Sequence, residues 1–270
     1  MKLKIVDAIM YDAPHLVNNL GGTAWVGHIP FSFWLVAYLK PKILVELGTH
    51  GGASYFSFCD SILANKLSTS AYAVDNWKGD QNTGGYGADV FLSVNEYNEN
   101  NFKKFSKLLK IDFDQAVSEF EDQSIDLLHL DGCHSYKAIS HDFRTWLPKL
   151  AKNSIVLFHD THEDRSEFGV KKFWNELKKD NPENCFEFDH CGGLGVYLTN
   201  LNSRQNSFSE NFKANFELSS NIFSVYGKYL YHKITKRHSK LELSIQQIKE
   251  ILTEIKLRDP ILAGKLKNLL

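Results

Sequence analysis

Short apolar runs alternate with segments of helical periodicity from about Lys42 to Asn200. This alternation predicts a doubly wound, mostly parallel α/β sheet of seven strands. Only a short segment containing Cys191-Gly192-Gly193 separates the last two strands, which predicts an antiparallel hairpin at the end of the sheet. The predicted strands are Ile43–Val45, Ala71–Val74, Lys107–Ile111, Ile125–Leu130, Ile155–Phe158, Phe186–Asp189 and Gly195–Leu198. The predicted helices are Ser54–Lys66, Val90–Phe105, Asp114–Glu119, Tyr136–Leu147 and Gly169–Lys179.

The segments on either side of this domain, which we place at residues 41–200, differ from it in pattern. Residues 1–40 are apolar and rich in aromatic side chains, and they predict either a helical layer packed on the sheet or a lid bordering a ligand. Residues 201–220 are rich in Ser and Asn and predict a linker. Residues 221–270 predict a helical extension for self-association or a partner chain, with a seam at Leu241, Ile245, Ile248, Leu252 and Ile255.

The amino-acid composition limits the kinds of protein that this chain can be. The 270 residues are 43% hydrophobic and 23% charged, which is ordinary for a globular protein. The formal net charge of -1 gives no global field for nucleic acid. We see no secretion signal and no apolar run long enough to cross a bilayer, so we expect a cytoplasmic protein. The four cysteines lack the paired spacing of a zinc site and are expected to be reduced thiols.

The segment Lys42–Ser54 predicts a buried strand, a glycine-rich turn and a helix that Ser54 could cap. Such a turn presents backbone N–H groups to a nucleotide-like ligand. Thr49 and His50 separate the first two glycines, so the spacing is not the G-x-G-x-x-G of dinucleotide binders. Glu46 at the strand end would repel a pyrophosphate but could hold an ammonium group. This combination favours S-adenosylmethionine over NAD or ATP.

Acidic residues also follow the next two predicted strands. Asp75 lies about twenty residues beyond the glycine turn, where a carboxylate can accept hydrogen bonds from ribose hydroxyls. The glycine-rich segment that begins at Trp77 predicts a mobile loop whose aromatic side chains could stack on a ligand. After the third strand, Phe113 could lie against an adenine while Asp112 accepts from its amino group. We interpret the neighbouring Asp114 as a helix N-cap.

Two acids and two histidines follow the fourth and fifth predicted strands: Asp131, His134, His159 and Asp160. Adjacent strands would bring these side chains to one rim of the sheet. One interpretation is a divalent metal held by Asp131, Asp160 and His159. The other is metal-free base catalysis, in which His134 or His159 removes a hydroxyl proton and a carboxylate orients the ring. His129, inside the fourth strand, is expected to be structural.

These motifs resemble a known family. They are Val45-Glu-Leu-Gly-Thr-His-Gly-Gly-Ala-Ser54, Asp75-Asn-Trp77-Lys-Gly-Asp80, Asp131-Gly-Cys-His134-Ser-Tyr136 and Val156-Leu-Phe-His-Asp-Thr161. Their order is similar to that of bacterial class I S-adenosylmethionine-dependent methyltransferases, Rossmann-like proteins whose parallel sheet ends in an antiparallel hairpin. The nearer resemblance is to a branch associated with glycosyltransferases of surface-polysaccharide assembly, and it covers roughly Trp25 to Leu198.

The resemblance implies roles for individual residues. Glu46, Gly48 and Ser54 would serve the methionine end of the cofactor, with Thr49 and Gly51 in the same turn. Asp75 and Trp77 would lie at the ribose, and Asp112 and Phe113 at the adenine. Asp131 and Asp160 are similar to acids that bind magnesium in sugar O-methyltransferases. His159 and Thr161 depart from that pattern, which leaves Mg²⁺, a softer ion such as Mn²⁺, or no metal as alternatives.

From these residues we expect an O-methyltransferase that acts on a sugar hydroxyl of a bacterial surface glycan or its precursor. His134 is the expected base, with Asp131 orienting it or ligating a metal. Two alternatives stay open. One is a metal-dependent O-methyltransferase of a small-molecule hydroxyl. The other is a non-catalytic cofactor-binding scaffold, joined to a glycan-assembly complex through the C-terminal helix.

Overall fold

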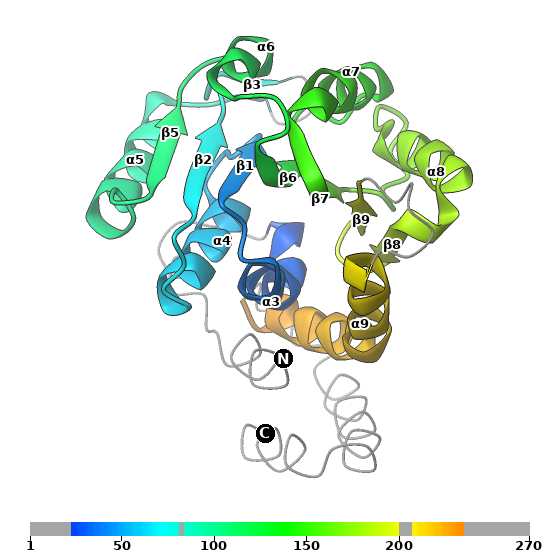
Figure 1. Ribbon diagram of the computed structural model, residues 1–270. Coiled ribbons are helices and arrows are strands. Elements are labelled where there is room, and N and C mark those ends of the chain that lie inside the picture. Colours follow the sequence, from blue (N-terminus) through cyan, green and yellow to red (C-terminus); the bar gives the residue numbers. More distant parts are fainter. Residues whose placement is uncertain (1–22, 81–83, 200–206, 235–270) are drawn as a thin grey trace.

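The computed structural model describes residues 23–80, 84–199 and 207–234 (Figure 1). Helices and strands alternate along most of this length, as the apolar pattern predicts. The helical elements are η1 Ala24–His28, α3 Ile29–Leu39, α4 Ala53–Ala64, α5 Ala88–Asn101, α6 Phe113–Ala116, η2 Val117–Glu119, α7 Tyr136–Trp146, η3 Leu147–Lys149, α8 Val170–Asp180, η4 Pro182–Asn184 and α9 Ser207–Ile234. The strands are β1 Ile43–Leu47, β2 Ser70–Val74, β3 Gly79–Asp80, β4 Gly84–Gly85, β5 Ser106–Leu109, β6 Ile125–Leu130, β7 Leu150–His159, β8 Cys185–Phe188 and β9 Leu194–Leu198.

The central sheet has seven strands in the order β5-β2-β1-β6-β7-β9-β8. The first five strands of that order pair in parallel. Strand β9 lies between β7 and β8 and is antiparallel to both. The predicted parallel sheet and its antiparallel ending are therefore confirmed. A separate two-stranded ribbon, β3 with β4, follows β2.

Two helical layers cover the sheet, and the strands supply alternate side chains to each (Figure 1). In β7, Ile155 and Leu157 join the cluster that holds residues of α3, α4 and α9. Val156 and Phe158 join the cluster that holds residues of α7 and α8. This two-residue period explains why the strand sequences are almost continuously apolar, because both faces of the sheet are buried.

The chain reverses its direction across the sheet between β1 and β6. Strand β1 pairs with β2 on one side and with β6 on the other, so the connections leave β1 toward opposite edges. In open parallel sheets, ligands bind beyond the carboxyl ends of the strands at this position. The carboxyl ends of β1, β2, β6 and β7 therefore enclose the place where we expect a site.

Helix α9 corrects the prediction of a linker. It runs from Ser207 to Ile234, so residues 207–220 of the predicted linker are helical and no break falls near residue 220. The buried side chains Phe212, Phe216 and Phe223 recur at steps of four and seven and pack with α3 and η1. The Ser and Asn between them had concealed this stripe. The predicted seam from Leu241 to Ile255 lies outside the described residues.

Element boundaries agree with the sequence to within a few residues, apart from two corrected caps. Ser54 does not cap α4, because Gly52 holds the N-cap position with a φ of 85°. Asp114 does not cap α6 either, since Asp112 precedes that helix. The carboxylate of Asp114 pairs with His141 at 2.7 Å instead.

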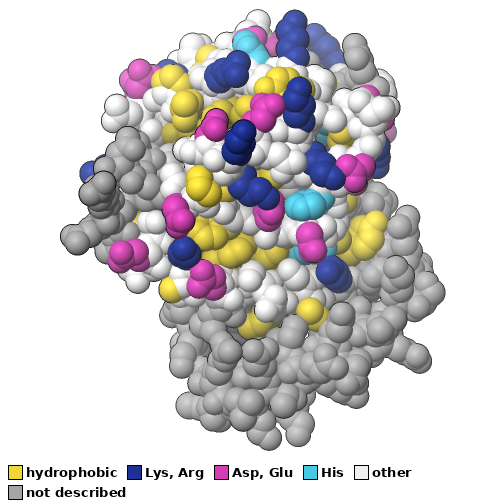
Figure 2. Space-filling model, turned by 90° about the vertical axis from the view of Figure 1, so that its right-hand side faces the viewer, with side chains coloured by type: hydrophobic (Ala, Val, Ile, Leu, Met, Phe, Trp, Pro, Cys, Tyr) yellow, Lys and Arg dark blue, Asp and Glu magenta, His cyan; other side chains and the backbone are white. Residues whose placement is uncertain are grey.

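The face of the molecule that carries α8 has mixed charge. Figure 2 shows Lys and Arg side chains interspersed with Asp and Glu on this face. Two of the pairs are Lys171 with Asp164 at 2.5 Å and Lys178 with Glu187 at 2.6 Å. No basic stripe of the kind that tracks a phosphate backbone is visible there. Among the described helices, none is both long enough and apolar enough to cross a bilayer.

Candidate active site

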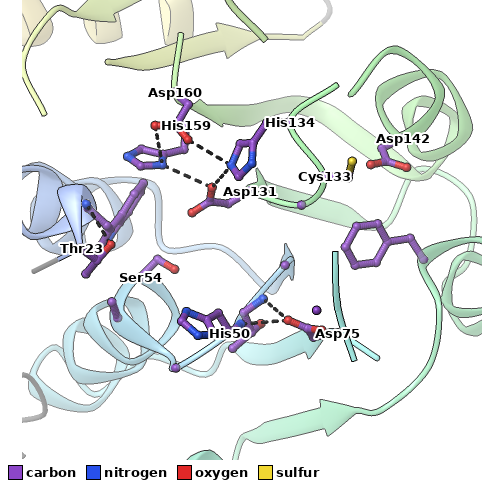
Figure 3. Close-up of a pocket in the computed structure, with 18 of the residues that line it drawn as sticks. Thr23, His50, Ser54, Asp75, Asp131, Cys133, His134, Asp142, His159 and Asp160 are labelled. Carbon is purple, nitrogen blue, oxygen red and sulfur yellow. Dashed lines mark hydrogen bonds and ion pairs between the residues drawn. The ribbon is translucent and has the colours of Figure 1, made fainter. Parts of the chain in front are cut away.

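A pocket of about 590 Å³ opens at the carboxyl edge of the sheet (Figure 3). Such a volume suits a small organic ligand or cofactor. Eleven of the residues that we predicted for the site line it: Gly48, Thr49, Gly51, Ser54, Asp75, Asp112, Phe113, Asp131, His134, His159 and Asp160. Two others, Glu46 and Trp77, are not part of its wall. Segments that are distant in sequence therefore converge as the strand ends predict.

Gly48 allows the first turn to pass against β6. Its φ is 89°, and a Cβ at this position would overlap the carbonyl oxygen of Asp131. The backbone ladder continues on both sides, because Gly48 N donates to Val74 O and Asp131 N donates to Leu47 O, each at 2.9 Å. A side chain would push these ends apart. The glycine thus sets the distance between the turn and Asp131.

Asp75 holds the glycine turn in place. Its Oδ2 accepts from the backbone N–H groups of Thr49 at 3.0 Å and His50 at 2.9 Å. Its Oδ1 accepts from the backbone N–H of Trp77 at 2.7 Å. A carboxylate offers about four acceptor positions. About one therefore stays free for a ribose hydroxyl, where we had expected contacts with both hydroxyls.

Trp77 supports the turn from behind. Its indole Nε1 donates to His50 O at 2.9 Å, and its ring lies 4.9 Å from that of Phe91. The side chain is buried and lies outside the pocket wall. The indole N–H is thus engaged with the backbone of the turn, and a direct contact of Trp77 with the cofactor stays a prediction.

Glu46 is also displaced from its predicted place. Its side chain is completely buried, and Oε2 lies 2.8 Å from Nδ1 of His129. Burial raises the pKa of Glu46, although the hydrogen bond with His129 opposes this change. The Trp25 ring, 4.4 Å from that of His129, separates this pair from bulk water. Glu46 therefore lies beneath the pocket and not on its wall.

Thr49, His50 and Ser54 are the polar residues of the turn segment that line the pocket, and Thr49 and Ser54 carry hydroxyl groups. Both residues are buried. The hydroxyl of Thr49 has no hydrogen-bond partner among the described residues. A buried hydroxyl without a partner is costly unless a ligand or water satisfies it. This end of the pocket is therefore suited to bind a polar group of a ligand.

Phe113 and Gly132 form the opposite end of the pocket. A Cβ added to Gly132 would lie 2.5 Å from the Phe113 ring and 3.8 Å from Oδ2 of Asp142. The absence of a side chain at Gly132 thus lets the Phe113 ring pack directly against the backbone at this end of the pocket. Asp112, expected here as an acceptor, is exposed and accepts from Nδ2 of Asn76 at 2.8 Å.

A compact group of acids and imidazoles lies at the rim (Figure 3). Nε2 of His134 is 3.0 Å from Oδ2 of Asp160 and 3.5 Å from Oδ1 of Asp131. Nδ1 of His159 is 3.3 Å from Oδ1 of Asp131 and 3.5 Å from Oδ1 of Asp160. Asp160 itself has a φ of 61°, a strained value for this residue type. All four predicted rim residues are therefore in mutual contact.

The two carboxylates control the charge of the two imidazoles. Burial would lower the pKa of His134, but hydrogen bonds with Asp131 and Asp160 raise it to about 10. Burial would likewise lower the pKa of His159, and the same acids raise it to about 9. Burial alone would raise the pKa of Asp131, yet the charge of His159 and the His134 hydrogen bond hold it well below its usual range. Both imidazoles therefore hold a proton near neutral pH in the metal-free site, and the role of His134 as base stays a prediction.

The donor atoms fit a divalent cation. One ligand atom each from Asp131, His134 and Asp160 lies within 4.8 Å of the others. Two carboxylate oxygens and an imidazole nitrogen suit ions such as Mn²⁺ better than Mg²⁺, which prefers oxygen alone. The predicted set contained His159 in place of His134, and it stays a prediction beside this group. A cation bound there would replace the imidazole proton of His134.

Asp142 is a pocket residue that the sequence interpretation missed. It lies on α7 between Ile139 and Phe143, which are both buried, so it falls on the apolar face of the helix. An acidic residue on the apolar face of the predicted helix is the signal that could have identified Asp142, because Asp is seldom fully buried unless it is paired. Thr23 and Trp25 also line the pocket. The lid interpretation of residues 1–40 thus applies to the described start of η1, and α3 forms part of the core.

Comparison with known proteins agrees with this geometry. Residues 45–161 match a family model described as a methyltransferase domain. An uncharacterized protein, y4gI, from Sinorhizobium fredii is 45% identical over 174 residues, which is 64% of this chain. The matched region spans only 19% of that relative, so there it is a small part of a longer protein.

Solved structures share the fold at low sequence identity. A proposed caffeoyl-CoA O-methyltransferase from Staphylococcus aureus has a TM-score of 0.51 and 13% identity, covering 64% of this chain and 82% of that one. The O-methyltransferase TomG from Streptomyces achromogenes, involved in tomaymycin synthesis and solved with S-adenosylmethionine, has a TM-score of 0.50 and 12% identity. That alignment covers 71% of this chain and 89% of TomG. The sheet order and the pocket at its carboxyl edge agree with the class I methyltransferase fold, and residues 45–161 match a methyltransferase domain.

Proposed function

We propose that the protein is an S-adenosylmethionine-dependent O-methyltransferase whose acceptor is a sugar hydroxyl of a bacterial surface glycan or its precursor. This proposal rests on the presence of two features in the same pocket. The glycine turn with Asp75 forms one wall, and the acid–imidazole group of Asp131, His134 and Asp160 forms the rim. The first suits a nucleoside cofactor, and the second suits activation of a hydroxyl.

The cofactor would lie along the pocket from Ser54 to Phe113. Its methionine end would meet the buried hydroxyls of Ser54 and Thr49 and the backbone of the glycine turn. One ribose hydroxyl would donate to the remaining acceptor position of Asp75. The purine would lie at the end of the pocket that Phe113 and Gly132 line. This direction points the methyl group toward the rim.

The transfer is a direct displacement. A bond forms between the acceptor oxygen and the methyl carbon, and the bond between that carbon and the sulfonium sulfur breaks, leaving its electron pair on sulfur. The hydroxyl proton must leave as well, because a protonated alcohol is a poor nucleophile. The site thus has to align two reacting atoms and stabilise a developing alkoxide.

The rim supplies the second requirement. A divalent cation held by Asp131, His134 and Asp160 would lower the pKa of an acceptor hydroxyl. A cation on Asp131 and Asp160 would also offset the negative charges that raise the pKa of His159, so we assign proton removal to His159 in the cation-loaded site. His134 is assigned to cation binding, because its Nε2 lies beside the carboxylates of Asp131 and Asp160 in the group of possible ligands.

The sugar acceptor rests on the resemblance of the motifs to methyltransferases associated with polysaccharide assembly. The length of the relative from Sinorhizobium fredii supports a segment that can work within a larger protein. A glycosyltransferase partner or self-association through residues 221–270 belongs to the same proposal. Most of that segment lies outside the described residues.

Methyl transfer can be measured directly. The protein is treated with EDTA, dialysed, and incubated with methyl-labelled S-adenosylmethionine and a panel of nucleotide sugars, oligosaccharides and small alcohols, with Mn²⁺, Mg²⁺ or no metal. We expect labelled sugar only with added metal, and more with Mn²⁺. Asp131→Asn should lower the rate at least a hundredfold. The matched control Asp164→Asn removes an exposed acid paired with Lys171 and should retain the parent rate.

The alternatives give different results. Full activity after chelation would contradict the cation assignment. Transfer to a small alcohol but to no sugar would establish the small-molecule alternative. Binding of S-adenosylhomocysteine by calorimetry without transfer to any acceptor would favour the non-catalytic scaffold.

A further inference from the structure

Asp142 is a buried acid that the proposed reaction does not use. Its side chain lines the pocket and is only 9% exposed. Its carboxylate has no hydrogen-bond partner among the residues that the structure describes. A buried carboxyl group without a partner is strongly unfavourable unless a ligand satisfies it. This feature therefore points to a polar group of the bound ligand.

The surroundings of Asp142 locate that group. Oδ2 of Asp142 would be 3.8 Å from a Cβ on Gly132, and that Cβ would also touch the Phe113 ring. Asp142 therefore lines the same end of the pocket as Gly132 and Phe113 (Figure 3). A planar ring bound at this end could present its edge to the carboxyl group.

Asp112, at the same end of the pocket, is less suited to this role. It is exposed to solvent, and Oδ1 already accepts from Nδ2 of Asn76 at 2.8 Å. A hydrogen bond made in water contributes little selectivity, because water satisfies the group equally well when the ligand lacks a partner. Asp142 is only 9% exposed, so once the pocket is filled little water could replace a partner that the ligand lacks.

The charge state of Asp142 fits recognition of a neutral base. Burial raises the pKa of Asp142 to about 7, with Asp114 adding to the rise and His141 opposing it. Near neutral pH the group is partly a carboxylic acid, with one O–H donor and one carbonyl acceptor. The edge of adenine offers the opposite pair, an N6 amino donor and an N1 acceptor.

We propose that Asp142 reads the Watson–Crick edge of the purine and makes the pocket selective for a 6-aminopurine. This inference rests on the proposed cofactor, because it assigns the purine end of S-adenosylmethionine to the end of the pocket that Phe113 and Asp142 line. Asp142 accepts from the N6 amino group in either charge state, and its protonated form also donates to N1. A purine without the amino group leaves the acid without its partner.

Two ligands and four variants test the inference by calorimetry on the full chain. The ligands are S-adenosylhomocysteine and its analogue with hydrogen in place of the 6-amino group. The variants are Asp142→Leu, Asp142→Ala, Asp142→Asn and the comparison variant Asp112→Leu, each checked for folding by circular dichroism. The parent protein should prefer the amino ligand by about tenfold, as expected for one buried hydrogen bond.

Asp142→Leu and Asp142→Ala should reduce this preference to less than about threefold and weaken binding of the amino ligand. Asp142→Asn should keep the preference, since its amide accepts from N6 and donates to N1. Asp112→Leu should also keep it. If Asp142→Leu does not fold, the ligand preference is measured in Asp142→Ala instead.

Three results would overturn the inference. In the first, the preference survives in folded Asp142→Leu or Asp142→Ala. In the second, substitution of Asp142 weakens the binding of both ligands equally, which means that Asp142 affects only the shape of the pocket. In the third, the preference disappears in Asp112→Leu and not at position 142. A parent protein that does not bind S-adenosylhomocysteine overturns the proposed cofactor as well, whereas binding without the Asp142 effect overturns this inference only.

Discussion

Nδ1 of His129 lies 2.8 Å from Oε2 of Glu46, and neither side chain is exposed. The two residues come from adjacent strands, β1 and β6, which pair in register at these positions. The pair therefore joins the strands on either side of the topological switch, directly beneath the glycine turn. Its first expected role is to hold this edge of the sheet together.

Glu46→Ala should lower the free energy of unfolding by about 3 kcal/mol, because it leaves the imidazole of His129 buried without its partner. Urea denaturation measures the loss. Glu46→Gln keeps an acceptor oxygen and should cost less. Affinity of the folded variants for S-adenosylhomocysteine should stay within about threefold of the parent. A loss of thirtyfold or more in a folded variant would instead show that Glu46 binds the cofactor directly.

Gly48→Ala should lower the free energy of unfolding by more than the usual cost of placing alanine at a positive φ. A methyl group at Gly48 overlaps the carbonyl oxygen of Asp131, whereas one at Gly84, with a φ of 77°, meets nothing within 4 Å. Gly84→Ala is thus the matched control, and it should cost about 1 kcal/mol. Thermal denaturation of both variants compares the two costs. Equal losses would mean that the backbone at β6 yields to the added methyl group without strain.

The sequence predicted the rim better than the wall of the pocket. Asp131 and His134 follow β6, His159 ends β7 and Asp160 follows it, so the parallel order of β6 and β7 brings them together. The direction of a side chain within a strand was harder to predict. Glu46 shares a face of β1 with Leu44, which packs in the layer of α3 and α4. The two-residue period contained this signal, but a polar residue at a strand end was interpreted as a ligand contact.

Long-range relationships account for the other differences. The helical spacing of Phe212, Phe216 and Phe223 was hidden by polar neighbours, and its meaning depends on the apolar surface of α3. The proton on His134 depends on two acids from different strands, one of which lies 26 residues away in sequence. A local sequence pattern does not show how two acids, one of them distant in sequence, change the pKa of a histidine. The element order could be predicted, whereas the charge state of the site required the assembled structure.

Asp75→Ala should affect stability and cofactor binding together. The substitution leaves the backbone N–H groups of Thr49, His50 and Trp77 without their acceptor. We expect a loss of about 3 kcal/mol in the free energy of unfolding, and at least tenfold weaker binding of S-adenosylhomocysteine. Denaturation and calorimetry measure the two effects separately. Asp122→Asn, an exposed acid paired with Lys149, is the control and should change neither. Unchanged binding in folded Asp75→Ala would remove Asp75 from the ribose site.

Asp142 should give the protein a pH-dependent stability that is independent of any ligand. Burial raises the pKa of this carboxyl group to about 7 in the folded state, while the unfolded chain titrates near the ordinary value of about 4. The unfolded state therefore loses the proton first as pH rises. The stabilising effect of the proton is complete below the unfolded pKa and is lost as pH rises through about 7.

Asp142→Asn removes this titration, so its stability relative to the parent should increase from pH 5 to pH 8. The increase should be on the order of 2 kcal/mol, because each unit of pKa shift corresponds to about 1.4 kcal/mol. Urea denaturation at several pH values, without ligand, measures the difference. Asp114→Asn removes an exposed acid of the same region and should show a much smaller change. A constant difference between Asp142→Asn and the parent across this range would mean that Asp142 is ionised throughout, in which case water or a backbone shift satisfies its carboxylate.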